Sequence, residues 1–378
     1  MKVLHTIPGL SLVSGGPSIC TYNLLKGLRL LGIDAEVLTF ESDSSEIKTI
    51  GGDPFIKQVK NDCKTPLLYS VNYRHYLQNT DYELYHANAL WTLPSHETLQ
   101  LAHKRHRPFV LATHGMLYPQ ALAVSKWRKK IIYELFQKDD LNKADCLQAT
   151  CMAEASYIRE LGIHTPVAIV PNCLDINLSV EPRKKVNTIR RIGFVGRLHP
   201  IKNLEALLMA WSGLGGLTNE AELLIVGCGD ENYESKLKQF AYEKNLHNVF
   251  FAGFLSGNEL QEMIHSFDYL VLPSKSENFG MVVPEALMNG VPVIASSGTP
   301  WEELNTHHCG WWKSCEVESL LEVLKEALSL SESERQIMGG DGRRLVLERY
   351  SMMQVAERMK KLYEWLLGTT ISKPDFVV

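Results

Sequence analysis

Several features that would mark other classes of protein are missing from this chain of 378 residues. No apolar run approaches the roughly 20 residues that a membrane-spanning helix needs. The opening stretch MKVLHTIPGL is broken by Pro8 and Gly9, unlike the apolar segment of a secretory signal. With 39 basic and 43 acidic residues, the chain lacks the basic excess typical of nucleic-acid-binding proteins. We therefore expect a cytoplasmic protein without a nucleic-acid partner.

Motifs for metal ions and dinucleotides are also lacking. The eight cysteines form no C-x-x-C pair, and the His307-His308-Cys309 triplet has no second ligand cluster at zinc-like spacing. There is no Asp-x-Asp motif. Neither half of the chain contains G-x-G-x-x-G followed by an acidic residue about 20 positions later. We therefore expect no bound metal, and a nicotinamide-dependent dehydrogenase does not fit.

The chain does contain a regular alternation of short apolar runs and longer stretches of helical periodicity. Residues 2–7 and 34–40 favour strands, and residues 16–33 between them favour a helix. Such units build parallel sheets that helices cover on both faces. The same pattern predicts further strands at 82–88, 108–115, 145–150, 166–172, 189–197, 221–227, 248–254, 269–274 and 291–297. It predicts further helices at 95–106, 126–144, 152–162, 203–214, 232–245, 256–267, 284–289 and 351–368.

The alternation is interrupted once, which divides the chain into two parts. Residues 176–188, INLSVEPRKKVNT, are polar and without core periodicity, as expected of a linker. A chain of this length exceeds what a single hydrophobic core usually supports. The predicted fold class is therefore α/β, with two successive doubly wound domains at 1–178 and 179–355.

Two cations stand where the second domain is expected to bind ligands. Doubly wound sheets bind ligands at the carboxyl ends of their strands. Arg197 and Lys202 follow a predicted strand and precede a predicted helix, a place that favours anions such as a diphosphate. The alternative is that both are solvated surface cations. After the next strand, Gly227 and Gly229 indicate a sharp turn or a close approach of the backbone to another group.

Two carboxylates flank a turn in the segment SENFGMVVPEALMNG. Glu277 falls in the loop after the predicted strand 269–274, and Glu285 falls in the first turn of a helix that begins near Pro284. Gly280 between them lets the backbone approach a ligand closely. A carboxylate in either place can accept hydrogen bonds from neighbouring hydroxyls of a ribose or a hexose. The alternative for Glu285 is a purely structural role at the positive end of its own helix.

The combination of Arg-x4-Lys, a later glycine turn and Glu-x7-Glu resembles the retaining glycosyltransferases of family 4, which have the GT-B architecture. The resemblance extends over nearly the whole chain and is strongest at 190–304 and 113–145. It implies two Rossmann-like domains facing across a cleft, with the acceptor bound by the first and the nucleotide sugar by the second. It also implies a C-terminal helix, residues 356–378, that crosses back to the first domain. The donor would be a UDP- or GDP-linked sugar, with no cofactor and no metal.

The resemblance also assigns roles to individual residues. It implies that Arg197 and Lys202 bind the diphosphate, Glu285 the ribose and Glu277 the donated sugar. His114, at a strand end in ATHGM, matches a family histidine near the sugar and the acceptor, although an isolated histidine is often structural. Gly15 and Gly16 match a flexible pair near the diphosphate, or form an ordinary tight turn. The wider set comprises Gly229, Phe254, Leu255, Phe279, Gly280 and Met281 for the nucleotide sugar, and His86, Asn88, Trp91 and His114 for the acceptor.

The expected mechanism follows from the absence of a candidate nucleophile. No acid of the first domain stands out as one, so we favour front-face attack through an oxocarbenium-like ion pair over a covalent intermediate. On this hypothesis His114 orients and polarises. The acceptor would be a glycan or a polyprenyl-linked saccharide, in the synthesis of a surface polysaccharide. The alternatives are a non-hydrolysing sugar-nucleotide epimerase and a non-catalytic nucleotide-sugar-binding protein.

Residues 125–136, SKWRKKIIYELF, combine cations and a tryptophan with an apolar stripe of helical period. One interpretation is a helix that lies on the inner membrane surface and gives the protein a peripheral location there. The other is a solvated, charged helix face above an apolar stripe buried in the core.

Overall fold

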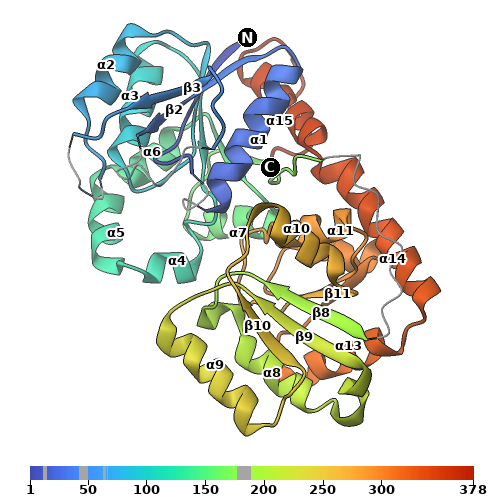
Figure 1. Cartoon of the computed structure of the whole chain (residues 1–378). Helices are drawn as coiled ribbons and strands as arrows, with labels where there is room; N and C mark the ends of the chain where they lie inside the picture. Colours follow the sequence, from blue (N-terminus) through green and yellow to red (C-terminus); the bar gives the residue numbers. More distant parts are fainter. Residues whose placement is uncertain (12–14, 42–49, 63–64, 66, 177–188) are drawn as a thin grey trace. The chain divides into compact units, whose positions relative to one another are not determined.

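The computed structural model describes residues 1–11, 15–41, 50–62, 65, 67–176 and 189–378. These residues form two compact units (Figure 1). Unit 1 comprises Met1–Asp175 together with Ser351–Val378, and unit 2 comprises Ile176–Tyr350. The predicted domain boundary at 178/179 lies outside the described residues. The chain rejoins unit 1 at Ser351, earlier than the expected residue 356.

Unit 1 is built on a parallel sheet of seven strands in the order β3-β2-β1-β4-β5-β6-β7. Three of its strands, β4, β5 and β6, are buried along their whole length, as expected of a sheet with helices on both faces. The strands are β1 (Lys2–Thr6), β2 (Asp34–Phe40), β3 (Ile56–Val59), β4 (Leu84–Ala87), β5 (Phe109–Ala112), β6 (Cys146–Ala149) and β7 (Val167–Ile169).

Two apolar clusters form the core of unit 1. One joins side chains of β1 and β2 to two helices far apart in sequence, the first and the last of the chain, which pack side by side (Figure 1). A Cβ atom added at Gly27 would lie 2.8 Å from Ala356 Cβ, so glycine allows these two helices to approach closely. The second cluster includes or contacts side chains of most of the remaining helices. The helices are α1 (Gly16–Leu30), α2 (Val71–Asn79), α3 (Leu93–Lys104), α4 (Pro119–Ala123), α5 (Lys126–Ile132), α6 (Lys138–Lys143), α7 (Met152–Glu160) and α15 (Met352–Leu366).

Unit 2 repeats the design with a six-stranded parallel sheet in the order β10-β9-β8-β11-β12-β13. Its strands are β8 (Arg190–Val195), β9 (Ala221–Val226), β10 (Val249–Gly253), β11 (Tyr269–Leu272), β12 (Val293–Ser296) and β13 (Gly310–Lys313). Its helices are α8 (Leu204–Ser212), α9 (Glu231–Glu243), α10 (Gly257–Ser266), α11 (Val282–Met288), α12 (Glu303–Thr306), α13 (Val317–Ser329) and α14 (Glu332–Leu345). The prediction of two doubly wound α/β domains is therefore confirmed.

In each sheet the strand order reverses at one place, and this place positions the candidate sites. In unit 1 the reversal lies between β1 and β4, and in unit 2 it lies between β8 and β11. The connections that leave two such neighbouring strands run to opposite faces of the sheet, so their carboxyl ends leave room for a ligand. The loops that follow β1, β4, β8 and β11 contain most of the residues singled out from the sequence.

Candidate functional site

The unit 2 site is centred on an ion pair between the Lys202 ammonium and the Glu277 carboxylate. Lys202 ends a short 3₁₀ turn, Pro200–Lys202, between β8 and α8, and Glu277 lies in the loop between β11 and α11. The pair therefore joins the two loops at the reversal point of the sheet. Both side chains remain partly accessible, with exposed fractions of 17% and 18%. Each side chain is therefore accessible enough to leave the ion pair and contact a ligand instead.

The loops around this pair are held by close contacts between backbones. Lys275 N donates to Ile201 O at 2.8 Å, and Glu277 N donates to Gly298 O at 2.9 Å. Gly298 must be a glycine, because an added Cβ would lie 2.5 Å from two carbonyl oxygens of the β11 loop. These contacts fix the loop that carries Glu277 against the loop that carries Lys202.

Glycine is required at two positions after β9 because of a similar close contact between backbones. Leu198 N donates to Cys228 O at 2.9 Å, so the loops after β8 and β9 run side by side. A Cβ atom at Gly227 or at Gly229 would lie 1.9 Å from a carbonyl oxygen of the neighbouring loop. The close backbone approach predicted for Gly229 is therefore an approach to Leu198, within the protein.

The turn between the two glutamates is shaped by Gly280 and anchored by Phe279. Gly280 has φ of 78°, a left-handed conformation that glycine adopts without strain. The Phe279 ring is buried against Trp301 and Tyr350, with ring centroids 5.1 and 5.7 Å apart. Phe279 could therefore contact a ligand through its backbone only, and its ring holds the turn in place.

Glu285 is a half-buried carboxylate in the first turn of α11. Its desolvation raises the pKa of the carboxyl from 4.5 to about 7. Among the described residues, no cation or hydrogen-bond donor compensates this cost. A half-buried carboxylate with a raised pKa and no partner within the described part of the protein is a candidate for binding a ligand.

The remaining unit 2 candidates are more exposed. Arg197 lies in the loop after β8 with its side chain in solvent, and it has no ion-pair partner among the described residues. Phe254, 70% exposed, and Leu255 follow β10, and the half-buried Met281 precedes α11. The structure places all of them in loops that follow strands, at the same edge of the sheet as Lys202 and Glu277.

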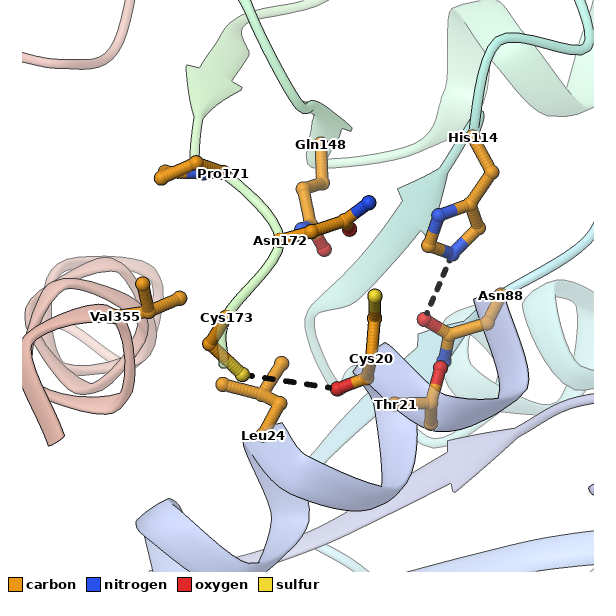
Figure 2. Close-up of a pocket in the computed structure, with 10 residues that line it drawn as sticks. All are labelled: Cys20, Thr21, Leu24, Asn88, His114, Gln148, Pro171, Asn172, Cys173 and Val355. Carbon is orange, nitrogen blue, oxygen red and sulfur yellow. Dashed lines mark hydrogen bonds between the residues drawn. The ribbon is translucent and has the colours of Figure 1, made fainter. Parts of the chain in front are cut away.

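In unit 1 a small pocket lies at the carboxyl ends of β4, β5 and β6, beside α1 (Figure 2). The side chains of His114, Gln148 and Asn172 border it together with the polar residues of α1 (Figure 2). Thr21 Oγ1 is buried and has no hydrogen-bond partner among the described residues. The lining residues are Cys20, Thr21, Leu24, Asn88, His114, Gln148, Pro171, Asn172, Cys173 and Val355.

The backbone at His114 has an unusual conformation that a buried carboxylate stabilises. His114 has φ of 45°, in the left-handed region that few non-glycine residues adopt. Glu154, on the first turn of α7, accepts hydrogen bonds from Gly115 N and from Thr113 Oγ1, the latter at 2.6 Å. It also accepts from Thr150 N and Oγ1 at 2.7 and 2.9 Å. Glu154 thereby holds both neighbours of His114 and positions its side chain.

A chain of buried polar groups leads from His114 into the core. His114 Nε2 lies 3.2 Å from Asn88 Oδ1, and Asn88 Nδ2 lies 3.3 Å from His5 Nδ1. His5 Nε2 lies 2.9 Å from the hydroxyl of Tyr363 on α15, which lies 2.7 Å from His86 Nδ1. His5 and His86 are register partners on β1 and β4, which explains their ring-centroid distance of 4.5 Å.

The imidazoles of His5, His86 and His114 in this polar series are neutral at physiological pH. Burial lowers the pKa of His114 to about 4. Burial, with a smaller contribution from His114, lowers the pKa of His5 to about 3. Burial and the two other histidines hold the pKa of His86 well below its ordinary value. An imidazole that stays neutral can accept or donate a hydrogen bond, but it adds no positive charge to the site.

This arrangement corrects one expected acceptor contact, His86, and restricts another, Asn88, which still borders the pocket. His86 is completely buried and bonded to Tyr363, so its side chain has no surface to offer an acceptor. Asn88 is 3% exposed, and both ends of its amide are used within the protein. Histidines and asparagines at strand ends look alike in sequence whether they face a ligand or the core. His5 and Tyr363, which complete the series of buried polar groups, were not predicted from the sequence.

Trp91 and the glycine pair have locally defined roles. Trp91 is half-buried, with φ of 67°, and its backbone N–H donates to Gln137 Oε1 at 2.6 Å. Its ring packs against the second apolar cluster and lies 5.7 Å from Lys129 Nζ. Gly15 has φ of 86° and caps α1, whose first residue is Gly16. The left-handed conformation explains the first glycine of the pair.

Helix α5 and the π-helical turn that follows it expose an apolar stripe. Trp127, Ile131 and Leu135 recur at helical spacing, and Trp127 and Leu135 are 78% and 73% exposed. Val124, also exposed, precedes the helix in extended backbone. The expectation of an apolar stripe buried beneath a charged face is therefore wrong for Trp127, Ile131 and Leu135, whereas Ile132 beside them is buried. Exposed cations flank them at Lys126, Arg128, Lys130 and Lys138.

No helix in the described part of the chain is both long and apolar enough to cross a bilayer. Within the described ranges, no three residues among His, Cys, Asp and Glu are grouped so that they could hold a metal ion.

Comparison with known proteins gives matches over nearly the whole chain. The family model described as Glycosyltransferase Family 4 matches residues 14–178, and the model described as Glycosyl transferases group 1 matches residues 177–362. An uncharacterized glycosyltransferase of Methanocaldococcus jannaschii is 32% identical over 202 residues, half of each chain. A GDP-mannose-dependent phosphatidylinositol monomannoside mannosyltransferase of Corynebacterium glutamicum is 28% identical over 54% of this chain and 57% of its own. The chain thus spans little more than half the length of these relatives.

Solved structures share the fold at lower sequence identity. Sucrose-phosphate synthase of Thermosynechococcus elongatus has a TM-score of 0.79 and 21% identity, covering 98% of this chain and all of its own. HepE of Anabaena, in complex with UDP and glucose, has a TM-score of 0.73 and 18% identity over 96% of this chain and 99% of its own. These likenesses support the GT-B fold of two Rossmann-like domains.

Proposed function

Because this chain belongs to glycosyltransferase family 4, we propose that it transfers a sugar from a nucleotide-diphosphate sugar to an acceptor hydroxyl and retains the anomeric configuration. The observation that carries the proposal is the Lys202–Glu277 ion pair at the reversal point of the unit 2 sheet. It brings together one group suited to a phosphate and one suited to sugar hydroxyls. The names of two similar proteins, one dependent on GDP-mannose and one in complex with UDP and glucose, support a donor of this class.

In the proposed complex, different groups of unit 2 bind different parts of the donor. Lys202 exchanges Glu277 for the diphosphate, and the exposed Arg197 adds a second cation. Glu277, once released, accepts hydrogen bonds from hydroxyls of the donated sugar, and Glu285 accepts from the ribose. The backbone of Phe279, Gly280 and Met281 lies along the diphosphate and sugar, and the loops at Gly229 and Phe254–Leu255 border the base.

The two cations would perform the electrostatic part of the reaction without a metal. The bond between the sugar C1 and the diphosphate oxygen breaks, and its electron pair stays on that oxygen. Charge therefore develops on the phosphate in the transition state, where preorganised cations stabilise it most. The acceptor oxygen then bonds to C1 from the same face, and its proton passes to the leaving phosphate oxygen.

Unit 1 would bind the acceptor around the pocket at His114, with Gly15 and Gly16 at the amino end of α1 beside it. We propose that the acceptor is a glycan or a lipid-linked saccharide on the cytoplasmic face of a membrane, in surface polysaccharide synthesis. The exposed stripe Trp127, Ile131 and Leu135, flanked by cations, supports this part of the proposal. Apolar side chains can enter the interface while the cations contact anionic headgroups.

Thermal-shift measurements with UDP-, GDP- and ADP-sugars test the proposal. A ligand that binds only the folded protein raises its melting temperature, by an amount that grows with its concentration relative to Kd. We expect one nucleotide class to raise the temperature and the corresponding free sugars to have no effect. If none of these nucleotide sugars stabilises the protein at millimolar concentration, the proposed donor class is wrong.

A further inference from the structure

The orientation of one buried amide determines which ring nitrogen of His114 carries a proton. Asn88 Nδ2 lies 3.4 Å from Thr6 O and 3.3 Å from His86 O. Backbone carbonyls can only accept hydrogen bonds, so the nitrogen end of the amide must face them. The oxygen end is therefore fixed on the opposite side, facing His114 Nε2 at 3.2 Å.

The proton positions of the neighbouring rings follow from this orientation. Asn88 Oδ1 can only accept, so His114 Nε2 carries the proton that it donates. Because His114 is neutral, its other ring nitrogen, Nδ1, has a lone pair. The two hydrogens of Asn88 Nδ2 are shared among Thr6 O, His86 O and His5 Nδ1. Because this nitrogen can only donate, the neutral His5 faces it with the lone pair of Nδ1 and carries its proton on Nε2.

Helix α15 completes the sequence of donors and acceptors. The protonated His5 Nε2 donates to the Tyr363 hydroxyl oxygen at 2.9 Å. The single proton of that hydroxyl is then directed to His86 Nδ1 at 2.7 Å. The contacts from His114 through Asn88, His5 and Tyr363 to His86 Nδ1 can thus each pair a donor with an acceptor. The remaining ring nitrogen, His86 Nε2, is buried and has no hydrogen-bond partner among the described residues. Buried networks of this kind resist rearrangement, since a reversed member leaves an unpaired polar group.

We propose that Asn88 is a positioning residue that holds His114 in one neutral tautomer, protonated on Nε2, so that His114 presents an acceptor lone pair at Nδ1 to the ligand of the unit 1 pocket. Figure 2 shows the second ring nitrogen of His114 turned toward the space between it and the side chains of Gln148 and Asn172. The complementary ligand group is a hydroxyl that donates its hydrogen. A ligand that offers only an ether or carbonyl oxygen at this point would leave two acceptors facing each other.

This inference deepens the proposed function and rests on it for the identity of the hydroxyl as one of a sugar. An accepting His114 discriminates between a sugar and its deoxy analogue at the contacted position. The analogue leaves the Nδ1 lone pair unsatisfied in a buried site. Which ring nitrogen of His114 carries the proton can be measured without any substrate.

The test is ¹⁵N NMR of the full chain labelled at histidine, in which protonated and unprotonated ring nitrogens have well-separated shifts. The His114 signals are assigned by their loss in His114→Gln. We expect the unliganded wild type to show His114 protonated on Nε2 alone at pH 7.5. In Asn88→Ala, where the fixed acceptor is gone, we expect averaging between both tautomers. Asn172→Ala, which removes another amide of the same pocket, serves as the matched control and should leave the His114 signals unchanged.

Two results would overturn the proposal: a wild-type His114 protonated on Nδ1, or an unchanged His114 tautomer in a folded Asn88→Ala. If Asn88→Ala does not fold, the wild-type spectrum still decides. A kinetic measurement separates this proposal from the proposed function. With an accepted nucleotide sugar, we expect Asn88→Ala to lower kcat about tenfold while the Kd of the nucleoside diphosphate stays within twofold. A failure to bind any nucleotide would contradict the proposed function and leave the tautomer result intact.

Discussion

The Lys202 ammonium and the Glu277 carboxylate pair across the point where the strand order of unit 2 reverses. The pair is local in space but not in sequence, since 75 residues separate its members. Each carries a charge complementary to a different part of a nucleotide-diphosphate sugar. In the proposed function, this ion pair would separate when a donor binds, and each side chain would then contact a different part of the donor.

Replacing Glu285 with glutamine should stabilise the protein at pH 8. The folded-state pKa of Glu285 is about 7, above its ordinary 4.5, so the folded state binds more protons than the unfolded state between these values. Stability from this group is therefore present below pH 4.5 and falls as pH rises toward 7. Glu285→Gln removes the cost of the buried charge, and calorimetry should show a higher melting temperature at pH 8. Glu322→Gln, at an exposed position of α13, should change it little. A lower melting temperature for Glu285→Gln would contradict the prediction.

The affinity for the nucleotide sugar should fall as pH decreases below about 7. The deprotonated Glu285 accepts from both ribose hydroxyls, whereas its protonated form has lost part of this capacity. The diphosphate diester of a nucleotide sugar has no group that titrates near neutral pH, so the ligand itself should not produce the effect. Isothermal titration at pH 6 and pH 8 measures it, and Glu285→Gln should bind about tenfold more weakly at pH 8 with a flat pH profile. A pH dependence that persists in this variant would assign the titration to another group.

Gly280→Ala should reduce activity more than stability. An alanine Cβ would lie 3.0 Å from Leu272 Cδ2 and 3.2 Å from Glu277 Cγ, in a backbone conformation with φ of 78°. Relief of this strain moves the loop that carries Glu277, and small displacements of a binding group are costly in rate. We expect kcat/KM to fall by at least tenfold. Gly216→Ala, where the nearest atom is 3.9 Å from the added Cβ, should retain the wild-type value. Equal activities of the two variants would show that the turn geometry is unimportant.

Trp127→Ser should weaken binding to anionic vesicles. The Trp127 ring is 78% exposed among cations of α5, which suits insertion at a membrane interface. Sedimentation with vesicles containing phosphatidylglycerol at low salt should give at least fivefold less bound variant than wild type. Tyr242→Ser, at an aromatic position of unit 2 that is 85% exposed, is the matched control and should bind as the wild type does. Absence of wild-type binding under these conditions would remove the membrane contact from the proposal.

The sequence was sufficient to predict the fold and the place of the unit 2 residues because both depend on local patterns. A strand, a loop with Lys202 or Glu277 and a helix follow one another within a few residues, and parallel sheets bring such loops to one edge. Elements in weakly periodic or unassigned stretches were missed, including β3, β13, α2, α13 and α14.

The polar chain of unit 1 could not have been predicted in the same way. His5 and Tyr363 are 358 positions apart, and their contact depends on the return of α15 to unit 1. Periodicity shows that a residue is buried but does not identify its partner. A histidine inside an apolar strand, as at His5, was the available signal. The same limitation applies to Trp127, because a helical stripe has the same period whether it faces the core or the solvent.

The turnover of Lys202→Ala, measured with the nucleotide sugar that stabilises the wild type, tests the central claim most directly. If Lys202 neutralises the leaving diphosphate, kcat should fall by about 10²–10³, as for the loss of one preorganised electrostatic contact. Lys236→Ala, at an exposed lysine of α9, should keep the wild-type kcat. Turnover of a folded Lys202→Ala within threefold of the wild type would contradict the role of this lysine and the site built around it.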